Sequence, residues 1–245
     1  MITFTVLLTI ILGLIVCIVA EILYIKFNGK PVAHPSIPRQ EQTIGQGPAL
    51  RYAILGDSTT ISQGGDYQKG YAVASANFLA KKHRVTWQNF GVSGARVQDV
   101  ADKQLSKSLE FKPDIVLIAV GANDVTHVTN NKSLKSGLEY IITQLQHHNP
   151  HVHIILTGSP DMGSVPRFPW PANYFADHKT KSINTIVIGL ARKHHQTFAP
   201  IAQETGPTFR AHPELFAVDK FHPTNDGYAL WIPVINKAIA WTVYP

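Results

Sequence analysis

The sequence predicts an α/β protein built on a parallel sheet with helices on both of its faces. Short apolar runs rich in β-branched residues alternate along the chain with longer segments whose apolar residues recur at helical spacing. Such alternation is typical of strand–helix–strand units, which form parallel sheets covered on both sides. The central strands are expected to be nearly continuous apolar runs, because they are buried on both faces.

The first strand is expected over 52–55, where an apolar run ends in Gly56, Asp57 and Ser58. The later strands are expected at 84–89, 114–120, 152–157 and 197–200. The helices are expected at 70–82, 97–109, 133–147, 174–194 and 225–241. The longest irregular loop is expected over 158–173, and a long loop at the carboxyl end of a strand is usually functional.

Length and composition limit the classes of protein that the chain can belong to. Its 245 residues suffice for one medium domain plus an appendage. A hydrophobic content of 44% with 16% charged residues fits a folded protein with a sizeable core. The net charge of +6 comes without a run of Lys and Arg, so no nucleic-acid partner is expected. Cys17 is the one cysteine in the sequence, so no intrachain disulfide is possible.

The N-terminal segment has the composition of a membrane anchor. Residues 1–20 contain no charged side chain, and about 20 apolar residues span a bilayer. Tyr24 and Lys26 are suited to the membrane interface. A cleaved signal peptide would need a basic start and a shorter apolar run, and bulky Val16 before Cys17 disfavours a lipoprotein cleavage site. A retained single-pass transmembrane helix is therefore expected over 1–27.

The segment over 28–49 is rich in Pro, Gly and polar residues and is expected to be a linker. The globular domain is expected over 50–245. Lys26, Lys30 and Arg39 follow the apolar run, and no Lys or Arg precedes it. Because basic residues beside a membrane helix favour the cytoplasmic side, this distribution favours a cytoplasmic globular domain. This charge bias is small and large domains cross membranes regardless, so the side of the membrane is left open.

Residues whose side chains or N–H groups could take part in a reaction follow several of the expected strands. Ser58 follows the first strand, at the edge where open α/β sheets bind ligands, although a serine there often caps a helix. Gly94 follows the second strand and lets a ligand approach its N–H, and Asn123 offers an amide after the third. Asp219 and His222 stand just before the last helix. Each is ordinary in a turn, but their joint occurrence favours a catalytic site.

Four separated blocks carry these residues. The blocks are Gly56-Asp57-Ser58, Gly91-Val92-Ser93-Gly94, Gly121-Ala122-Asn123-Asp124 and Asp219-Lys220-Phe221-His222-Pro223. In these blocks the chain resembles the SGNH, or GDSL-type, hydrolases over about Leu50 to the C-terminus. The resemblance implies a three-layer α/β/α fold with a flavodoxin-like parallel sheet. Thr59 stands where the family usually has Leu after the serine, a position outside the chemistry.

The resemblance also implies a role for each residue. Ser58 would be the nucleophile, His222 the base that takes its proton, and Asp219 the carboxylate that orients the imidazole. The Ser58 and Gly94 N–H groups and the Asn123 amide would form an oxyanion hole. No metal or organic cofactor is needed. Two aspartates, Asp99 and Asp114, are distant alternatives to Asp219, while Asp57 and Asp124 are expected to position loops.

Two other patterns point less clearly to function. The histidines around Asn149, namely His147, His148, His151 and His153, lack acidic or Cys partners at metal-site spacing, so a solvated helix end is expected. The loop over 91–94 lacks the G-x-G-x-x-G pattern of a dinucleotide site.

The expected function is hydrolysis of an ester through an acyl-enzyme. The resemblance leaves carboxylesters, lysophospholipids, thioesters and acetylated sugars open as substrates. Phe168, Trp170 and Tyr174 in the long loop are expected to line an apolar acyl pocket, and a membrane anchor would suit lipid-derived substrates. A non-catalytic binding module on the same fold is the alternative, and an intact set of Ser, His and Asp argues against it.

Overall fold

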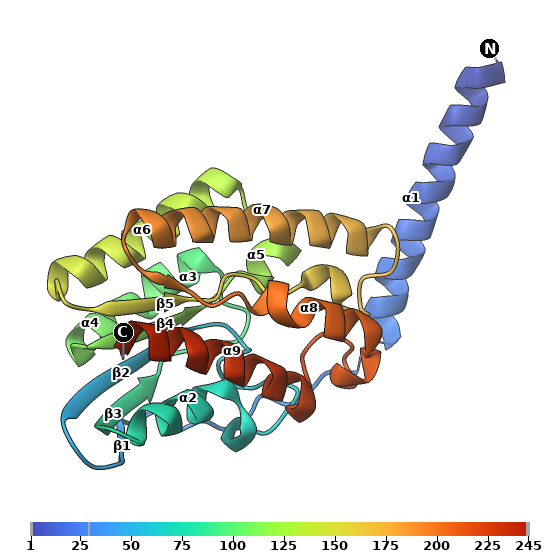
Figure 1. The fold of residues 1–245 in the computed structure, drawn as a ribbon. Helices are drawn as coiled ribbons and strands as arrows, with labels where there is room; N and C mark the ends of the chain where they lie inside the picture. The colour runs from blue at the N-terminus through green and yellow to red at the C-terminus, as the bar shows by residue number, and fades with distance from the viewer. Residues whose placement is uncertain (1, 29, 244–245) are drawn as a thin grey trace.

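A mostly parallel sheet forms the middle layer of the molecule in the computed structural model, which describes residues 2–28 and 30–243 (Figure 1). Within these residues the sheet has six strands in the order β1-β3-β2-β4-β5-β6. The strands are β1 (Gln42–Ile44), β2 (Ala49–Gly56), β3 (Arg84–Asn89), β4 (Ile115–Ala119), β5 (His153–Leu156) and β6 (Thr197–Phe198). Every neighbouring pair is parallel except β1 with β3.

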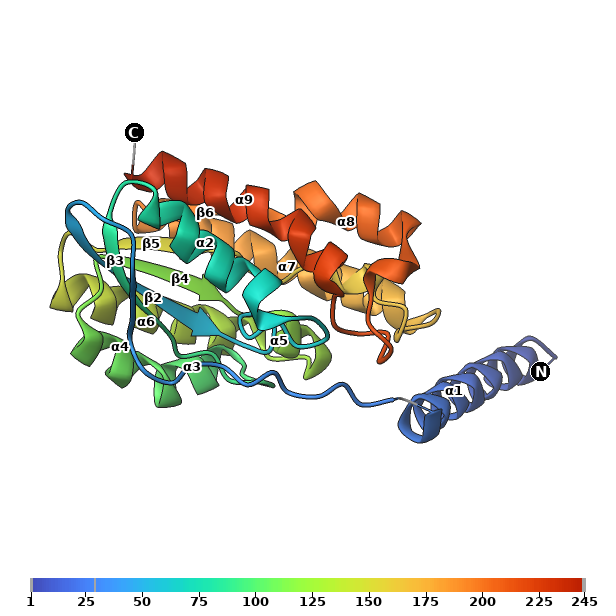
Figure 2. The ribbon, with the colours of Figure 1, turned by 90° about the horizontal axis from the view of Figure 1, so that it is seen from below.

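Helices cover both faces of the sheet (Figures 1 and 2). One face carries α3 (Val97–Lys103), α4 (Leu105–Phe111), α6 (Asn131–His148) and α7 (Ala172–Lys193). The other carries α2 (Tyr71–Ala80), α8 (Ile201–Ala211) and α9 (Asn225–Val243). Side chains of a strand alternate between the faces, so Leu55 lies in one apolar core and Ile54 in the other. The expected three-layer fold is confirmed.

The remaining elements are short. They are α5 (Ala122–Thr126) and the 3₁₀ turns η1 (Tyr67–Lys69), η2 (Met162–Ser164) and η3 (Pro213–Leu215). The helix expected over 97–109 is instead the pair α3 and α4, which meet at Gln104. The buried amide of Gln104 accepts a hydrogen bond from Gly56 N–H at 2.9 Å and donates one to Gly56 O at 2.8 Å. The break between α3 and α4 thus places the Gln104 side-chain amide against Gly56 at the end of β2.

Two elements lie in segments where neither a strand nor a helix was expected. β1 falls inside the segment expected to be a linker, and Ile37 before it is buried in the core that contains α2 and α9. The sheet therefore begins before residue 50. The helix α8 contains Gly206 and Pro207. Both residue types disfavour helix interiors, so the sequence pattern did not predict this helix.

The N-terminal helix α1 (Ile2–Asn28) projects away from the sheet and its covering helices (Figures 1 and 2). Its side chains are described for residues 4–20 and 23, and large apolar ones such as Phe4, Ile10 and Val16 are exposed. Within the described part of the chain, no helix combines the length and the apolar character that crossing a membrane requires, so the transmembrane anchor expected over 1–27 is not found. Met1 and the side chains of Tyr24 and Lys26 lie outside the described residues.

Candidate active site

The turn after β2 presents Ser58 at the carboxyl edge of the sheet. Gly56 has φ +153°, and a Cβ there would lie 2.0 Å from the Ala119 carbonyl oxygen, so only glycine fits. Asp57 N–H then donates to that same oxygen at 3.2 Å, and Gln63 N–H donates to Ser58 O at 3.0 Å. These bonds fold the chain back over the end of the sheet and fix the backbone of Ser58.

A closed turn before α9 carries Asp219 and His222. Ala217 N–H donates to His222 O at 2.7 Å, and Lys220 N–H donates to Ala217 O at 2.8 Å. Asp219 Oδ1 accepts hydrogen bonds from the N–H groups of Phe221 and His222, both at 3.0 Å. The carboxylate is thus held by the backbone directly beside the imidazole that follows it.

Ser58, His222 and Asp219 form a continuous hydrogen-bonded row. His222 Nε2 lies 3.0 Å from Ser58 Oγ, and His222 Nδ1 lies 2.5 Å from Asp219 Oδ2. All three residues are buried, with exposed fractions of 4%, 9% and 6%. An ionised carboxylate only accepts hydrogen bonds, so Nδ1 carries the proton and Nε2 is left to accept the serine hydroxyl. This is the arrangement in which an imidazole can take the serine proton.

The environment keeps Asp219 ionised. Burial alone would raise the pKa of this carboxyl. Hydrogen bonds from the His222 ring and from the N–H groups of His222 and Phe221 outweigh burial, and the pKa lies below its ordinary value. The carboxylate is therefore available at neutral pH to orient the imidazole.

The loops that carry Gly94 and Asn123 meet beside this row. Gly94 has φ +79° and is exposed, and Asn123 in α5 donates from its amide to Ala95 O at 3.1 Å. Ser93 Oγ donates to Gln63 Oε1 at 2.7 Å, which ties the Gly94 loop to the Ser58 turn. Among the described residues, neither the Ser58 nor the Gly94 N–H has a hydrogen-bond acceptor. Both N–H groups are free to bind a substrate oxygen.

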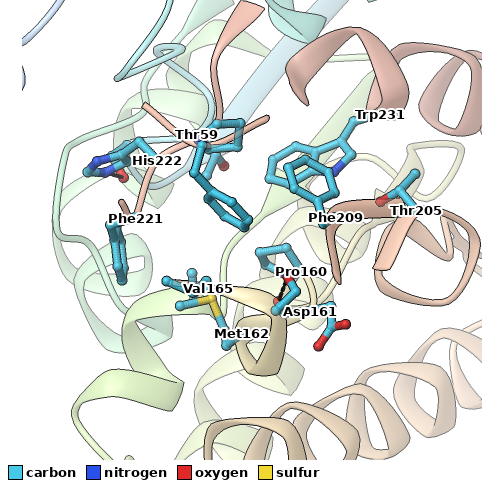
Figure 3. Close-up of a pocket in the computed structure, with 15 residues that line it drawn as sticks. Thr59, Pro160, Asp161, Met162, Val165, Thr205, Phe209, Phe221, His222 and Trp231 are labelled. Atoms are coloured by element: carbon cyan, nitrogen blue, oxygen red, sulfur yellow. Dashed lines mark hydrogen bonds between the residues drawn. The ribbon is translucent and has the colours of Figure 1, made fainter. Parts of the chain in front are cut away.

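A narrow apolar cavity of about 30 Å³ adjoins Ser58 and His222 (Figure 3). Its apolar walls come from η2 and the loop after it, from α8, from the turn before α9 and from α9. The wall residues are Met162, Val165, Phe209, Phe216, Phe221 and Trp231. Figure 3 shows His222 and Phe221 at one end, with Phe209, Thr205 and Trp231 at the other. The cavity is thus a small apolar space directly beside Ser58 and His222.

This lining corrects the expected acyl pocket. None of Phe168, Trp170 and Tyr174 lines the cavity. Trp170 and Tyr174 are 68% and 65% exposed, while Phe168 packs edge-on against Phe221 with ring centroids 6.0 Å apart. The aromatic residues of the long loop predicted an apolar site near this loop. They did not predict that α8 and α9 also line the cavity, because only the folded chain brings these helices close to Ser58.

The other aspartates have partners elsewhere. Asp99 pairs with Lys103 at 2.7 Å, and Asp114 accepts a hydrogen bond from Arg51 N–H at 2.7 Å, so neither replaces Asp219. Asp124 accepts from Val97 N–H at 3.0 Å and so holds the start of α3, as expected. Within the described part of the chain, no three His, Cys, Asp or Glu side chains gather as metal ligands would.

Asp57 forms a separate buried network next to the nucleophile. Its Oδ1 accepts hydrogen bonds from Thr59 N–H at 2.9 Å and from Thr59 Oγ1 at 2.8 Å, and Tyr71 Oη lies 2.9 Å from Thr59 Oγ1. Burial raises the pKa of Asp57 to about 6, while the two bonds from Thr59 and the nearby His222 oppose the rise. Asp57 is thus a second titratable carboxyl beside the row of Ser58, His222 and Asp219.

A serine, a histidine and an aspartate thus lie in one hydrogen-bonded row at the carboxyl edge of a three-layer α/β/α sheet. The model of the GDSL-like lipase/acylhydrolase family matches residues 54–230, and the chain belongs to this family. The resemblance to the SGNH hydrolases is therefore confirmed, and the chain is an ester hydrolase. No curated protein matches the chain in sequence.

Solved structures of similar fold support the same architecture. TesA shares 17% identity with a TM-score of 0.64, covering 79% of this chain and 99% of its own. A catalytic mutant of Axe2, an acetylxylan esterase from Geobacillus stearothermophilus, shares 19% identity with a TM-score of 0.62, covering 80% of this chain and 96% of its own. Phospholipase A1 from Streptomyces albidoflavus shares 17% identity with a TM-score of 0.61, covering 77% and 99%. At these identities the likeness shows the fold alone.

Proposed function

We propose that the protein hydrolyses esters through an acyl-enzyme formed on Ser58. The observation that carries the proposal is the hydrogen-bonded row from Ser58 through His222 to Asp219. Ser58 Oγ attacks the carbonyl carbon while His222 Nε2 takes its proton, and the alcohol leaves with that proton. His222 then takes a proton from water, whose oxygen attacks the acyl group; the bond to Ser58 Oγ breaks, His222 returns the proton to Ser58 Oγ, and the acid leaves.

The negative charge of each tetrahedral intermediate needs hydrogen-bond donors. The Ser58 and Gly94 N–H groups and the second N–H of the Asn123 amide are proposed to supply them. The hydrogen bond from Asn123 to Ala95 O supports this role, because it fixes the amide plane before the substrate binds. Fixed donors stabilise the charge without first having to reorient.

A fluorophosphonate probe tests the nucleophile. The unmodified protein should be labelled on Ser58, and Ser58→Ala should abolish labelling, because the probe reacts only with an activated serine. Ser136→Ala on the exposed surface of α6 is the matched control and should label like the unmodified protein. Absence of labelling in the unmodified protein would favour the alternative, a non-catalytic binding module on the same fold.

The cavity supports an ester with an apolar acyl group as the substrate. Its walls are aliphatic and aromatic, and it opens at Ser58 and His222, where the carbonyl would lie. The structural neighbours include an acetylxylan esterase and a phospholipase, so acetylated sugars and lipid esters are the two substrate classes to separate.

The location of the enzyme at a membrane is also a proposal. The helix α1 exposes large apolar side chains along its length, and exposed apolar surface of this kind needs a cover. A lipid membrane would supply the cover and would bring lipid esters to the enzyme. The full chain should then sediment with membranes after alkaline carbonate washing, whereas a chain starting at Lys30, which keeps Ile37 and β1, should stay in the supernatant and remain active. Full-length protein in the supernatant would exclude membrane attachment.

A further inference from the structure

The three side chains of Tyr71, Thr59 and Asp57 form a hydrogen-bonded chain with a fixed direction. An ionised carboxylate can only accept, so Thr59 Oγ1 gives its proton to Asp57 Oδ1 over 2.8 Å. The oxygen of Thr59 then accepts from Tyr71 Oη over 2.9 Å. Thr59 N–H adds a second donor to the same carboxylate oxygen at 2.9 Å. Two donors that converge on one carboxylate oxygen favour the ionised form of Asp57.

Thr59 is the link on which the chain depends. It follows Ser58 directly, it is 8% exposed, and Asp57 and Tyr71 are each 1% exposed, so water does not replace the hydroxyl readily. A Leu at this position, the residue common in the family that the sequence resembles, would have no hydroxyl to donate or accept. The polar chain is thus specific to sequences with a hydroxyl after the serine.

We propose that Thr59 is a positioning residue that keeps Asp57 ionised beside His222, so that Asp57 is a second carboxylate supporting the imidazolium formed during the reaction. The inference rests on the proposed triad, because it assigns Asp57 an effect on the base of that triad. Asp57 touches no reacting atom in this scheme. It acts through its charge, and Thr59 acts through Asp57.

The charges around Asp57 agree with this role. Burial raises its pKa to about 6, and the two hydrogen bonds from Thr59 are the main influences that oppose burial. His222 also lowers the pKa of Asp57, and Asp57 directly precedes Ser58, whose Oγ lies 3.0 Å from His222 Nε2. Asp124 raises it, while Tyr71 in α2 contacts Thr59 rather than the carboxyl, and Tyr228 in α9 donates to Gln63 O at 2.7 Å. Loss of the Thr59 hydroxyl should therefore leave Asp57 protonated up to a higher pH.

The test compares Thr59→Val with Thr59→Ser. Valine has nearly the shape of threonine but no hydroxyl, whereas serine keeps the hydroxyl and loses only a methyl group. The measurement is kcat/KM on a short activated ester across pH 4 to 9. In Thr59→Val the acid side of the profile should move up by about one pH unit, because a hydrogen bond to a charged group is lost. The alkaline plateau should be kept, and Thr59→Ser should follow the unmodified enzyme.

Two results would overturn the proposal. One is a Thr59→Val profile that superimposes on that of the unmodified enzyme; the other is a uniform loss across all pH values, which would indicate a merely structural role. If Thr59→Val fails to fold, Tyr71→Phe removes the donor to Thr59 and should give a smaller shift in the same direction. Failure of the proposed triad is distinguishable, since Ser58→Ala would then keep activity at every pH.

Discussion

His222 Nε2 lies 3.0 Å from Ser58 Oγ, although 164 positions of sequence separate the two residues. Ser58 is set by the end of β2, and His222 by the turn that leads into α9. The carboxyl ends of parallel strands lie at the same edge of the sheet. The turn before α9 lies at this edge too, and there it meets the turn after β2. The pair is therefore a product of the fold rather than of any local motif.

We predict that Ser58→Ala and His222→Ala each remove nearly all esterase activity. Loss of either residue leaves the other without a partner for the proton transfer, so the double variant should be scarcely worse than either single one. The measurement is kcat/KM on a simple activated ester for the three variants. Strictly additive losses, or full activity in His222→Ala, would contradict the assignment.

Asp219→Ala should reduce kcat/KM strongly but leave more activity than His222→Ala. The carboxylate orients the imidazole and supports its positive charge, which is only part of the work of the base. Asp114→Ala is the matched control, because Asp114 binds Arg51 N–H and not the imidazole. An Asp219→Ala variant as active as the control would remove Asp219 from the triad.

The strands and the site blocks were predictable from the sequence because their signals are local. A run such as Ala53-Ile54-Leu55 ending in glycine marks a buried strand and its turn without knowledge of the rest of the chain. The four blocks then followed from their order and from residue types that acyl transfer needs. Hydrogen bonds within one turn, such as the one that His222 N–H donates to Asp219 Oδ1, could be predicted for the same reason.

The missing parts are those that depend on contacts between distant segments. Pairing of Gln42 with Trp87 makes β1 a strand, although its own segment is rich in Pro and Gly. Pro207 argues against a helix locally, but the packing of Phe209 in the core stabilises α8. The cavity combines Met162, Phe209 and Trp231, whose proximity no spacing rule in the sequence indicates.

Asn123→Ala should lower kcat by about 100-fold or more with little change in KM. The amide is expected to bind the charge that develops on the carbonyl oxygen, and this charge is largest in the transition state. Steady-state kinetics on one ester for the variant and the unmodified enzyme measure the split between kcat and KM. A change confined to KM would show that Asn123 binds the substrate instead.

Val165→Phe should shorten the acyl chain that the enzyme accepts. The larger ring would fill the apolar cavity, so kcat/KM for a medium-chain ester should fall at least about 10-fold relative to an acetyl ester. Trp170→Ala is the matched control, since Trp170 is exposed outside the cavity and should leave the chain-length profile unchanged. An unmodified enzyme that prefers acetyl esters, with Val165→Phe unaffected, would place the acyl group elsewhere.

The last prediction concerns stability and Asp57. The pKa of this carboxyl is raised from its ordinary value of 3.8 to about 6 in the folded chain, chiefly by burial. Between these two values the folded chain binds a proton that the unfolded chain has released, so Asp57 makes the folded state less stable as pH rises through this window. A shift of this size corresponds to about 3 kcal/mol. Asparagine has a similar shape and does not titrate.

The free energy of unfolding of Asp57→Asn, relative to the unmodified protein, should therefore increase by up to about 3 kcal/mol from pH 3.5 to pH 7. Urea unfolding of both proteins at the two pH values measures this change, and titratable groups that do not interact with Asp57 cancel in the comparison. Asp102→Asn, at an exposed position on α3, is the control for the loss of a surface carboxylate. A pH-independent difference for Asp57→Asn would mean that Asp57 is ionised as readily in the folded chain as in the unfolded one.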